Sequence, residues 1–226
     1  MKAWTLLFDI DGTMMTSAHA GTSAMAVTAK ELFGVDEIAP LKVHGRCDRG
    51  ILAELFQSLD VSYDRHHEEF CRRYYQNLPG SLIKNQGRLL PGVRKLLETL
   101  HAQSNVALGI LTGNLQKAAE IKLKHVGVDQ YFSFGGFGDE FADRNDVAAQ
   151  AVQSAKITIK NRFSKEHIWV IGDTPNDIRC ARSIGAKVLA VETGGGCSQS
   201  LSNAKPDLLC KDLSDCGMWL KSLNSE

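Results

Sequence analysis

The strongest constraint on the fold of this chain is a pair of aspartates, Asp9 and Asp11, placed where an apolar run ends. Residues 4–7 have the length and composition of a buried strand, and Phe8 leads directly into the pair. Ionised aspartates are rarely buried without a partner, and two of them close together raise the cost of each other's charge. A divalent cation with oxygen ligands would offset that cost. The alternative is a surface hairpin tip, because Asp-Gly is a common turn dipeptide.

Two later segments repeat this arrangement. The apolar run 108–111 ends in Thr112-Gly113-Asn114, and the run 168–171 ends in a segment, residues 172–177, that contains Asp173 and Asp177. Each run is short and closed by small polar residues, which is typical of a buried strand that leads through a loop into a helix. In a parallel sheet such loops meet at one edge, where open α/β folds bind ligands.

The order and identity of these segments resemble the haloacid dehalogenase-like superfamily of phosphohydrolases. Residues 9–13 match its motif I, residues 111–114 its motif II, and residues 172–177 its motif IV. The resemblance covers nearly the whole chain and is closest to the phosphoglycolate phosphatase-like branch with a helical C1 cap. It implies an α/β fold, a doubly wound parallel sheet with a small all-helical cap inserted after motif I.

The segment after motif I carries apolar residues at helical spacing and lacks a good strand candidate. The pattern predicts helices over 20–33, 48–59 and 64–78, the third ended by Pro79-Gly80. Helices without strands between a strand and the next α/β unit fit an inserted cap. We therefore expect a helical cap domain at 16–85, and an α/β core domain made of 1–15 and 86–226.

From Leu89 onward strands and helices alternate regularly, which favours a doubly wound sheet. We expect Asn114 to cap a helix that ends at Gly127, a short strand over 131–134, and a helix over 143–157. Thr174 has the features of an N-cap with Pro175 at the first helical position.

The resemblance assigns chemistry to the acidic residues. Asp9 is expected to be the nucleophile that forms an aspartyl-phosphate, and Mg²⁺ is the expected cofactor, held by Asp9, Asp11, Asp173 and Asp177. Asp11 would contribute its backbone carbonyl to the metal, while its side chain protonates the leaving oxygen and then activates water. For that role its pKa should lie above that of Asp9. Asp177 has a competing role, because Thr174-x-x-Asp177 approximates a capping box.

Five residues are candidates for phosphate binding or for catalysis beside it. Gly12 permits a tight turn and Thr13 can hydrogen-bond nearby oxygens, while Thr112 supplies a catalytic hydroxyl. Gly113 and Asn114 offer backbone N–H groups beside a helix N-terminus, which suits an anion. The alternative for this last pair is an ordinary strand-to-helix cap.

The family's third motif is a lysine, and the segment expected to carry it contains none. Arg144, 29 residues before Asp173, is the predicted replacement, since a cation at a helix start is not favoured by the helix dipole. A solvated surface arginine is the alternative. Lys156 and Lys160 are weaker candidates because both lie nearer to motif IV than the family pattern allows.

The segment 43–50 contains Arg46 and resembles the loop that faces the active site in C1-capped relatives. Arg46 is therefore a candidate contact for an acidic or polyhydroxy substrate, with a solvated surface loop as the alternative. The chain is electrically balanced, with 26 basic and 26 acidic residues, which gives no support for binding nucleic acid or an anionic membrane.

The leading functional hypothesis is a magnesium-dependent phosphatase acting on a small phosphorylated metabolite, of the phosphoglycolate or sugar-phosphate type. A β-phosphoglucomutase-like phosphotransferase uses the same core residues, and a non-catalytic binding or regulatory protein is motivated by the missing lysine. We expect a small-molecule phosphate ester as partner, no nucleic acid, no membrane, and a monomer or homodimer. The six cysteines show neither a zinc pattern nor a disulfide framework, so the expected location is the cytoplasm.

Overall fold

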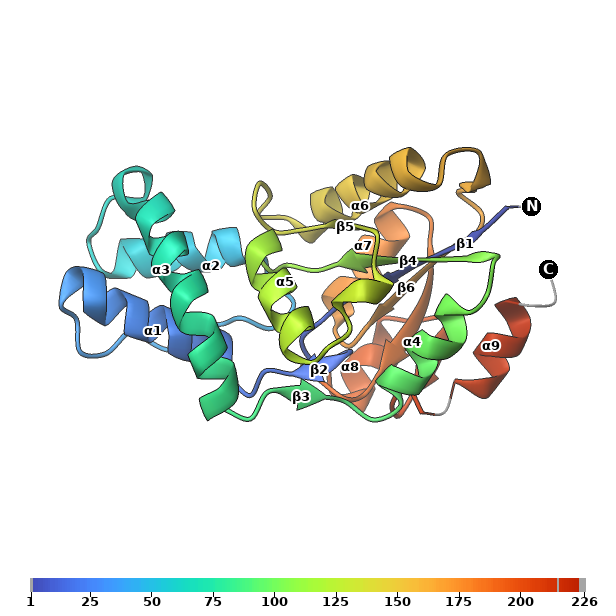
Figure 1. The fold of residues 1–226 in the computed structure, drawn as a ribbon, viewed down its shortest axis with the longest axis horizontal. Helices are drawn as coiled ribbons and strands as arrows, with labels where there is room; N and C mark the ends of the chain where they lie inside the picture. Colours follow the sequence, from blue (N-terminus) through green and yellow to red (C-terminus); the bar gives the residue numbers. More distant parts are fainter. Residues whose placement is uncertain (1, 215, 224–226) are drawn as a thin grey trace.

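The computed structural model describes residues 2–214 and 216–223 of the chain. Its central element is a six-stranded sheet, part of which is labelled in Figure 1. The strand order is β5-β4-β1-β6-β7-β8, and every pair of neighbours is parallel. This confirms the predicted fold class. The strands are β1 Trp4–Phe8, β4 Val106–Leu111, β5 Phe134–Gly136, β6 Ile168–Gly172, β7 Lys187–Val191 and β8 Leu208–Cys210.

Helices cover both faces of this sheet, as the alternation of side chains along β1 requires. Leu7 belongs to the apolar cluster formed with α6, α7 and α8, whereas Leu6 and Phe8 belong to the cluster formed with α4, α5 and α9. The helices of this part of the chain are α4 Val93–His101, α5 Gln116–His125, α6 Arg144–Ile159, α7 Pro175–Ser183, α8 Ser198–Asn203 and α9 Gly217–Leu223, with the 3₁₀ turns η1 Asp129–Tyr131 and η2 Lys160–Arg162.

The strand register brings the chemically interesting loops together. Phe8 at the end of β1 lies opposite Ile110 of β4 and Ile171 of β6. The residues that follow these three strands therefore emerge side by side at one edge of the sheet. Asp9 is one of them.

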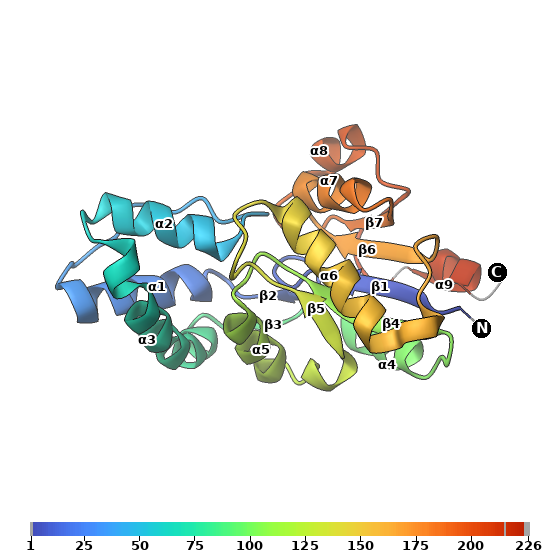
Figure 2. The ribbon, with the colours of Figure 1, turned by 90° about the horizontal axis from the view of Figure 1, so that it is seen from above.

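Three further helices lie side by side at the opposite end of the molecule from the N-terminus (Figures 1 and 2). They are inserted between two short antiparallel strands, which connect them to the sheet. The predicted domain boundaries at 15/16 and 85/86 remain a prediction. No helix in the described ranges has the length and apolarity needed to cross a membrane. The elements are β2 Met15–Thr16, α1 Ala20–Phe33, α2 Asp48–Ser58, α3 Tyr63–Lys84 and β3 Arg88–Leu89.

The expected end of the third helix is wrong. Helix α3 continues through Pro79 to Lys84. Proline removes one backbone hydrogen bond, but Ser81 and Leu82 beyond it are buried, and Leu82 packs in the main apolar cluster. Packing of the last turn thus outweighs the local preference of Pro79-Gly80 to end the helix.

The strand expected over 131–134 is also displaced. Residues 129–131 form a 3₁₀ turn, and β5 begins at Phe134 and includes Gly135 and Gly136. A Cβ atom on Gly136 would lie 2.3 Å from the backbone oxygen of Val147 in α6. Gly136 is thus a strand residue on which helix α6 packs closely.

Candidate active site

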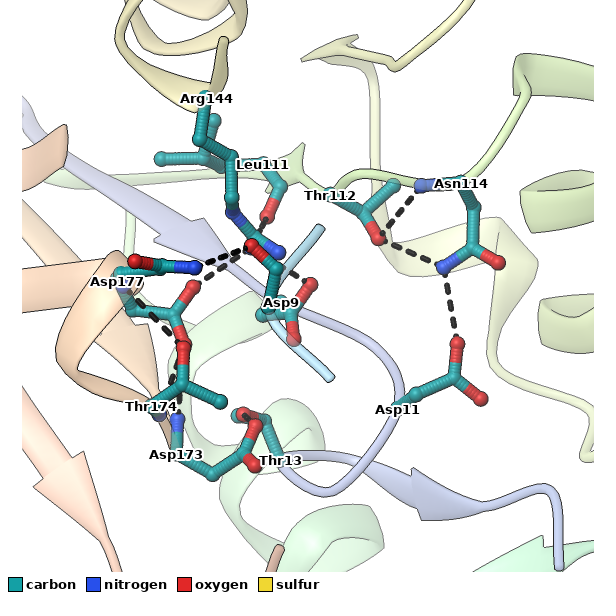
Figure 3. A network of polar contacts seen from close by, with 12 residues as sticks. Asp9, Asp11, Thr13, Leu111, Thr112, Asn114, Arg144, Asp173, Thr174 and Asp177 are labelled. Atoms are coloured by element: carbon teal, nitrogen blue, oxygen red, sulfur yellow. Dashed lines mark hydrogen bonds and ion pairs between the residues drawn. The ribbon is translucent and has the colours of Figure 1, made fainter. Parts of the chain in front are cut away.

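Three buried aspartates meet at the edge of the sheet where β1 and β6 end (Figure 3). Asp9 follows β1, Asp173 follows β6, and Asp177 lies in the first turn of α7. One carboxylate oxygen from each lies within 4.8 Å of the others. Residues far apart in the sequence are therefore gathered within the size of a metal coordination sphere.

Arg144 is the cation that faces this cluster. It is the first residue of α6, and its side chain is 4% exposed. The Nη2 atom donates to Asp9 Oδ1 at 3.0 Å, to Asp177 Oδ1 at 2.6 Å and to the backbone oxygen of Leu111 at 3.2 Å. The structure thus places Arg144 inside the site and not on the surface.

One arginine does not balance three buried carboxylates. Burial raises the pKa of Asp9 to about 6, although the charge of Arg144 opposes the shift. Burial also raises the pKa of Asp173 to about 8, and the charges of Asp177 and Asp9 add to the effect. Such raised pKa values indicate a site that is short of positive charge.

The residues around Asp173 fit a small hard cation. Its Oδ1 accepts a hydrogen bond from Thr13 Oγ1 at 2.9 Å, and its Oδ2 accepts from the Gly195 N–H at 2.6 Å. A Cβ atom on Gly12, whose φ is +86°, would lie 2.5 Å from Asp173 Oδ2, so only glycine allows this close approach. The donor set of Asp9, Asp173 and nearby backbone consists of oxygens, which Mg²⁺ prefers.

Asp177 uses both of its carboxylate oxygens within the protein. Oδ1 accepts from Arg144, while Oδ2 accepts from the N–H groups of Asp173 and Thr174 and from the hydroxyl of Thr174 at 2.6 Å. The capping box expected from Thr174 and Asp177 is confirmed, with Pro175 at the start of α7. The part of Asp177 in metal binding remains a prediction.

Thr112 and Asn114 lie at the end of β4, beside Asp11. The amide Nδ2 of Asn114 donates to Thr112 Oγ1 at 2.8 Å and to Asp11 Oδ2 at 2.9 Å (Figure 3). The prediction that Asn114 caps the next helix is wrong. Helix α5 begins at Gln116, and its first N–H groups, those of Leu115 and Gln116, are bound by the carboxylates of Asp48 and Asp139.

Lys122, which binds Asp11, was not among the site residues predicted from the sequence. This lysine of α5 is 4% exposed, and its Nζ lies 2.5 Å from Asp11 Oδ2 and 2.6 Å from Asn114 Oδ1. It shares the buried face of α5 with Ala118 and Ala119, four and three residues earlier. A lysine at an otherwise apolar helix position was the signal that could have revealed it.

The prediction that the pKa of Asp11 lies above the pKa of Asp9 is wrong. Burial raises the pKa of Asp11, but the charge of Lys122 and the hydrogen bonds from Lys122 and Asn114 outweigh it, so the pKa is lowered. The pKa of Asp9 is raised. In this conformation Asp11 is thus the more acidic of the pair, because its side chain lies against an ammonium group and away from the Asp9 cluster.

The segment between α1 and α2 closes the site from the side of the three inserted helices. The Asp48 N–H donates to the Gly113 oxygen at 2.7 Å, and Asn176 Nδ2 donates to the Gly45 oxygen at 2.8 Å. A Cβ on Gly113 would lie 2.1 Å from the Arg46 oxygen. Gly113 therefore allows a close backbone approach.

These elements line a partly open cavity of about 280 Å³. Arg46 is among its lining residues, but its guanidinium binds both carboxylate oxygens of Glu54 and the Lys42 oxygen. Its expected contact with substrate remains a prediction. The cavity is lined by all the predicted site residues except Thr13 and Asp177, namely Asp9, Asp11, Gly12, Arg46, Thr112, Gly113, Asn114, Arg144 and Asp173.

Both the sequence and the structure of this chain are similar to those of known proteins. A family model described as haloacid dehalogenase-like hydrolase matches residues 6–191. The phosphoglycolate phosphatase of Vibrio cholerae serotype O1 is 25% identical over 222 residues, which cover 94% of this chain and 95% of that protein. A haloacid dehalogenase-like hydrolase from Streptococcus pneumoniae has a similar structure, with a TM-score of 0.66, 25% identity, and coverage of 96% of this chain and 98% of the other. A hydrolase from Pseudomonas syringae gives a TM-score of 0.70 at 23% identity, with coverage of 97% and 98%.

Proposed function

Because the chain belongs to the haloacid dehalogenase-like hydrolase family, we propose that it is a phosphatase that hydrolyses phosphate monoesters of small metabolites with Mg²⁺ through an aspartyl-phosphate on Asp9. The observation that carries this proposal is the cluster of Asp9, Asp173 and Arg144, which lines a partly open cavity. Relatives named phosphoglycolate phosphatase support the reaction class.

Asp9 is positioned to act as the nucleophile. Its Oδ1 is held by Arg144 at 3.0 Å, which restricts rotation of the carboxylate and leaves Oδ2 for attack on phosphorus. As the bond between Asp9 and phosphorus forms, the bond to the leaving oxygen breaks, and that oxygen takes up a proton. Mg²⁺, when bound by Asp9, Asp173 and the Asp11 backbone, would neutralise charge on the phosphoryl group and orient it.

Asp11 is the proposed source and acceptor of protons. Beside Lys122 its carboxylate is ionised, which suits the second step, in which it accepts a proton from the water that attacks the aspartyl-phosphate. In the first step it can donate a proton only after it has left the Lys122 ion pair. Thr112 and the Gly113 N–H would hold phosphoryl oxygens on the other side of the cavity.

The test is a screen of phosphate esters with Mg²⁺ or with EDTA, using the Asp9→Asn variant. We expect release of inorganic phosphate from at least one ester, dependence on Mg²⁺, and loss of turnover by about 10⁴-fold or more in Asp9→Asn, because an amide cannot act as the nucleophile. Asp36→Asn is the matched control, since Asp36 is an exposed aspartate whose ion-pair partner within the described residues is Lys30.

Two outcomes would contradict the proposal. One is the absence of phosphate release from every ester, and the other is release that Asp9→Asn leaves unchanged while circular dichroism shows a folded protein. Transfer of phosphate to an added sugar without release of free phosphate would instead identify a phosphotransferase that uses the same Asp9 chemistry.

A further inference from the structure

The cavity has a second end, away from the Asp9 cluster, where the alcohol part of the substrate must lie. With the phosphoryl group at Asp9, as proposed, the rest of the ester would face the cavity wall formed by the inserted helices, which includes Met25, Asp48 and Tyr74. We propose that this alcohol carries no negative charge, so that the preferred substrates are phosphate esters of uncharged or cationic alcohols and not of hydroxy acids. This inference rests on the proposed phosphatase function and specifies its substrate class.

The positive charge of Lys122, at the end of the cavity away from the Asp9 cluster, is already neutralised by carboxylates of the protein. Lys122 is buried, and its Nζ binds Asp11 Oδ2 at 2.5 Å and Asn114 Oδ1 at 2.6 Å. The charge of Lys122 also acts on Asp48, whose pKa would otherwise be raised further by burial. A substrate carboxylate would have to compete with two carboxylates of the protein for one ammonium group.

Asp48 supplies the second of these carboxylates. It is the first residue of α2, it is 8% exposed, and its Oδ2 accepts from the Leu115 N–H at 3.0 Å. Burial raises its pKa to about 6, so it is ionised at the pH of a neutral or mildly basic assay. Together Asp11, Asp48 and Lys122 give this end of the cavity an excess of negative charge.

The hydroxyl of Tyr74 lies in the field of the same two carboxylates. Tyr74 of α3 lines the cavity and is buried, and its pKa lies well above 10 because of burial and, next, because of the charges of Asp48 and Asp11. The field that opposes a tyrosinate at this position would also oppose a carboxylate of the substrate. It does not oppose a hydroxyl group.

The other cations that line the cavity are also bound to carboxylates. Arg144 is held between Asp9 and Asp177, and Arg46 is held by Glu54. The remaining polar side chains on the wall formed by the inserted segment are hydroxyl and imidazole groups, which pair well with the hydroxyls of an alcohol. They are those of Thr16, Ser17, His19, Thr22, His44 and Tyr74.

Three phosphate esters of nearly equal size allow the effect of substrate charge to be measured separately from the effect of substrate size. They are 2-hydroxyethyl phosphate, phosphoethanolamine and 2-phosphoglycolate, whose alcohols end in a neutral, a cationic and an anionic group. With Mg²⁺ at pH 8, we expect kcat/KM for 2-phosphoglycolate to be about tenfold or more below that for 2-hydroxyethyl phosphate, since burying a like charge opposes binding. For an ester that is not turned over, the inhibition constant against p-nitrophenyl phosphate hydrolysis gives the same comparison.

A pair of variants then tests the cause. Asp48 and Asp139 both bind an N–H at the start of α5, through Leu115 and Gln116, but only Asp48 lines the cavity. Asp48→Asn and Asp139→Asn each remove one charge and keep an oxygen that can accept the N–H. We expect Asp48→Asn to raise the ratio of kcat/KM for 2-phosphoglycolate over 2-hydroxyethyl phosphate by about threefold or more, and Asp139→Asn to leave it unchanged.

A wild-type preference for 2-phosphoglycolate, or equal use of the anionic and neutral esters, would overturn the inference and leave the phosphatase proposal intact. An unchanged ratio in a folded Asp48→Asn protein would also overturn it. Failure to release phosphate from any ester at all would instead defeat the proposed function itself.

Discussion

Replacing Arg144 tests both the stability and the chemistry of the site. In Arg144→Met the buried methionine fills part of the space of the arginine, but Asp9 and Asp177 lose their shared cation. Removing one partner of a buried ion pair costs about 3–5 kcal/mol, because the remaining charge is left without compensation. For a chain of this length each kcal/mol corresponds to about 2–4 °C, so Tm should fall by about 6–20 °C in EDTA at pH 8.

The size of this effect should depend on pH and on metal. Burial already raises the pKa of Asp9 to about 6 in the presence of Arg144, and removal of the arginine raises it further. A carboxyl group whose pKa is higher in the folded protein stabilises the folded state fully when the pH is below its pKa in the unfolded chain. This stabilisation is lost as the pH increases through the pKa of the group in the folded protein. The loss of stability in Arg144→Met should therefore shrink between pH 8 and pH 5.5, and Mg²⁺ should raise Tm more in the variant than in the wild type.

The assay is thermal denaturation followed by circular dichroism, with turnover of a good ester measured in parallel. Loss of a preorganised cation beside the reacting group typically lowers kcat by about 10²–10³-fold. Arg144→Lys is the matched control, which keeps the charge and should recover part of both stability and turnover. A Tm within about 2 °C of wild type in EDTA at pH 8, together with turnover within about threefold, would refute the assignment of Arg144 as the compensating cation.

Two further predictions follow from single groups. Burial raises the pKa of Asp48 in the folded protein from 3.8 to about 6, so ionisation of Asp48 destabilises the fold as the pH rises through that interval. Asp48→Asn should therefore add about 1–3 kcal/mol to the free energy of unfolding at pH 7.5 and little at pH 4. The measurement is a urea titration in EDTA. Equal effects at the two pH values would contradict this reasoning. Gly80 lies inside α3, and a Cβ atom at this position would have open space around it. Gly80→Ala should therefore stabilise the protein by about 0.5–1 kcal/mol without changing turnover. Destabilisation in the same urea titration would contradict the helical geometry at this position.

The strands that lead to the acidic residues could be predicted because each of these strands is a short apolar run. Asp9 and Asp173 follow β1 and β6, and the parallel register of these neighbouring strands places the two side chains together. Local pattern and general topology are sufficient for such positions. Arg144 could be proposed for a similar reason, since it begins a helix at the expected distance from Asp173.

Positions that depend on packing between distant elements could not be predicted in this way. Pro79 looked like a helix end, but burial of the following turn keeps α3 helical. Lys122 lies on the buried face of α5, but the carboxylate that it binds is evident only when α5 is placed against Asp11. The low pKa of Asp11 has the same origin, because the ammonium group that causes it is 111 residues away in the sequence.

The capping of α5 links the inserted helices to the chemistry of the core. Asn114 has the sequence features of a helix cap, yet Asp48 of α2 and Asp139 bind the N–H groups at the start of α5. The Asn114 amide is thereby left for Thr112 and Asp11, and it helps to hold the Asp11 carboxylate against Lys122. A residue of the inserted segment thus supplies the cap that lets a core residue orient the proposed acid and base. Asp48 is therefore connected to Asp11 through the start of α5 and Asn114, so the proposed site for the substrate alcohol lies next to the proposed acid and base.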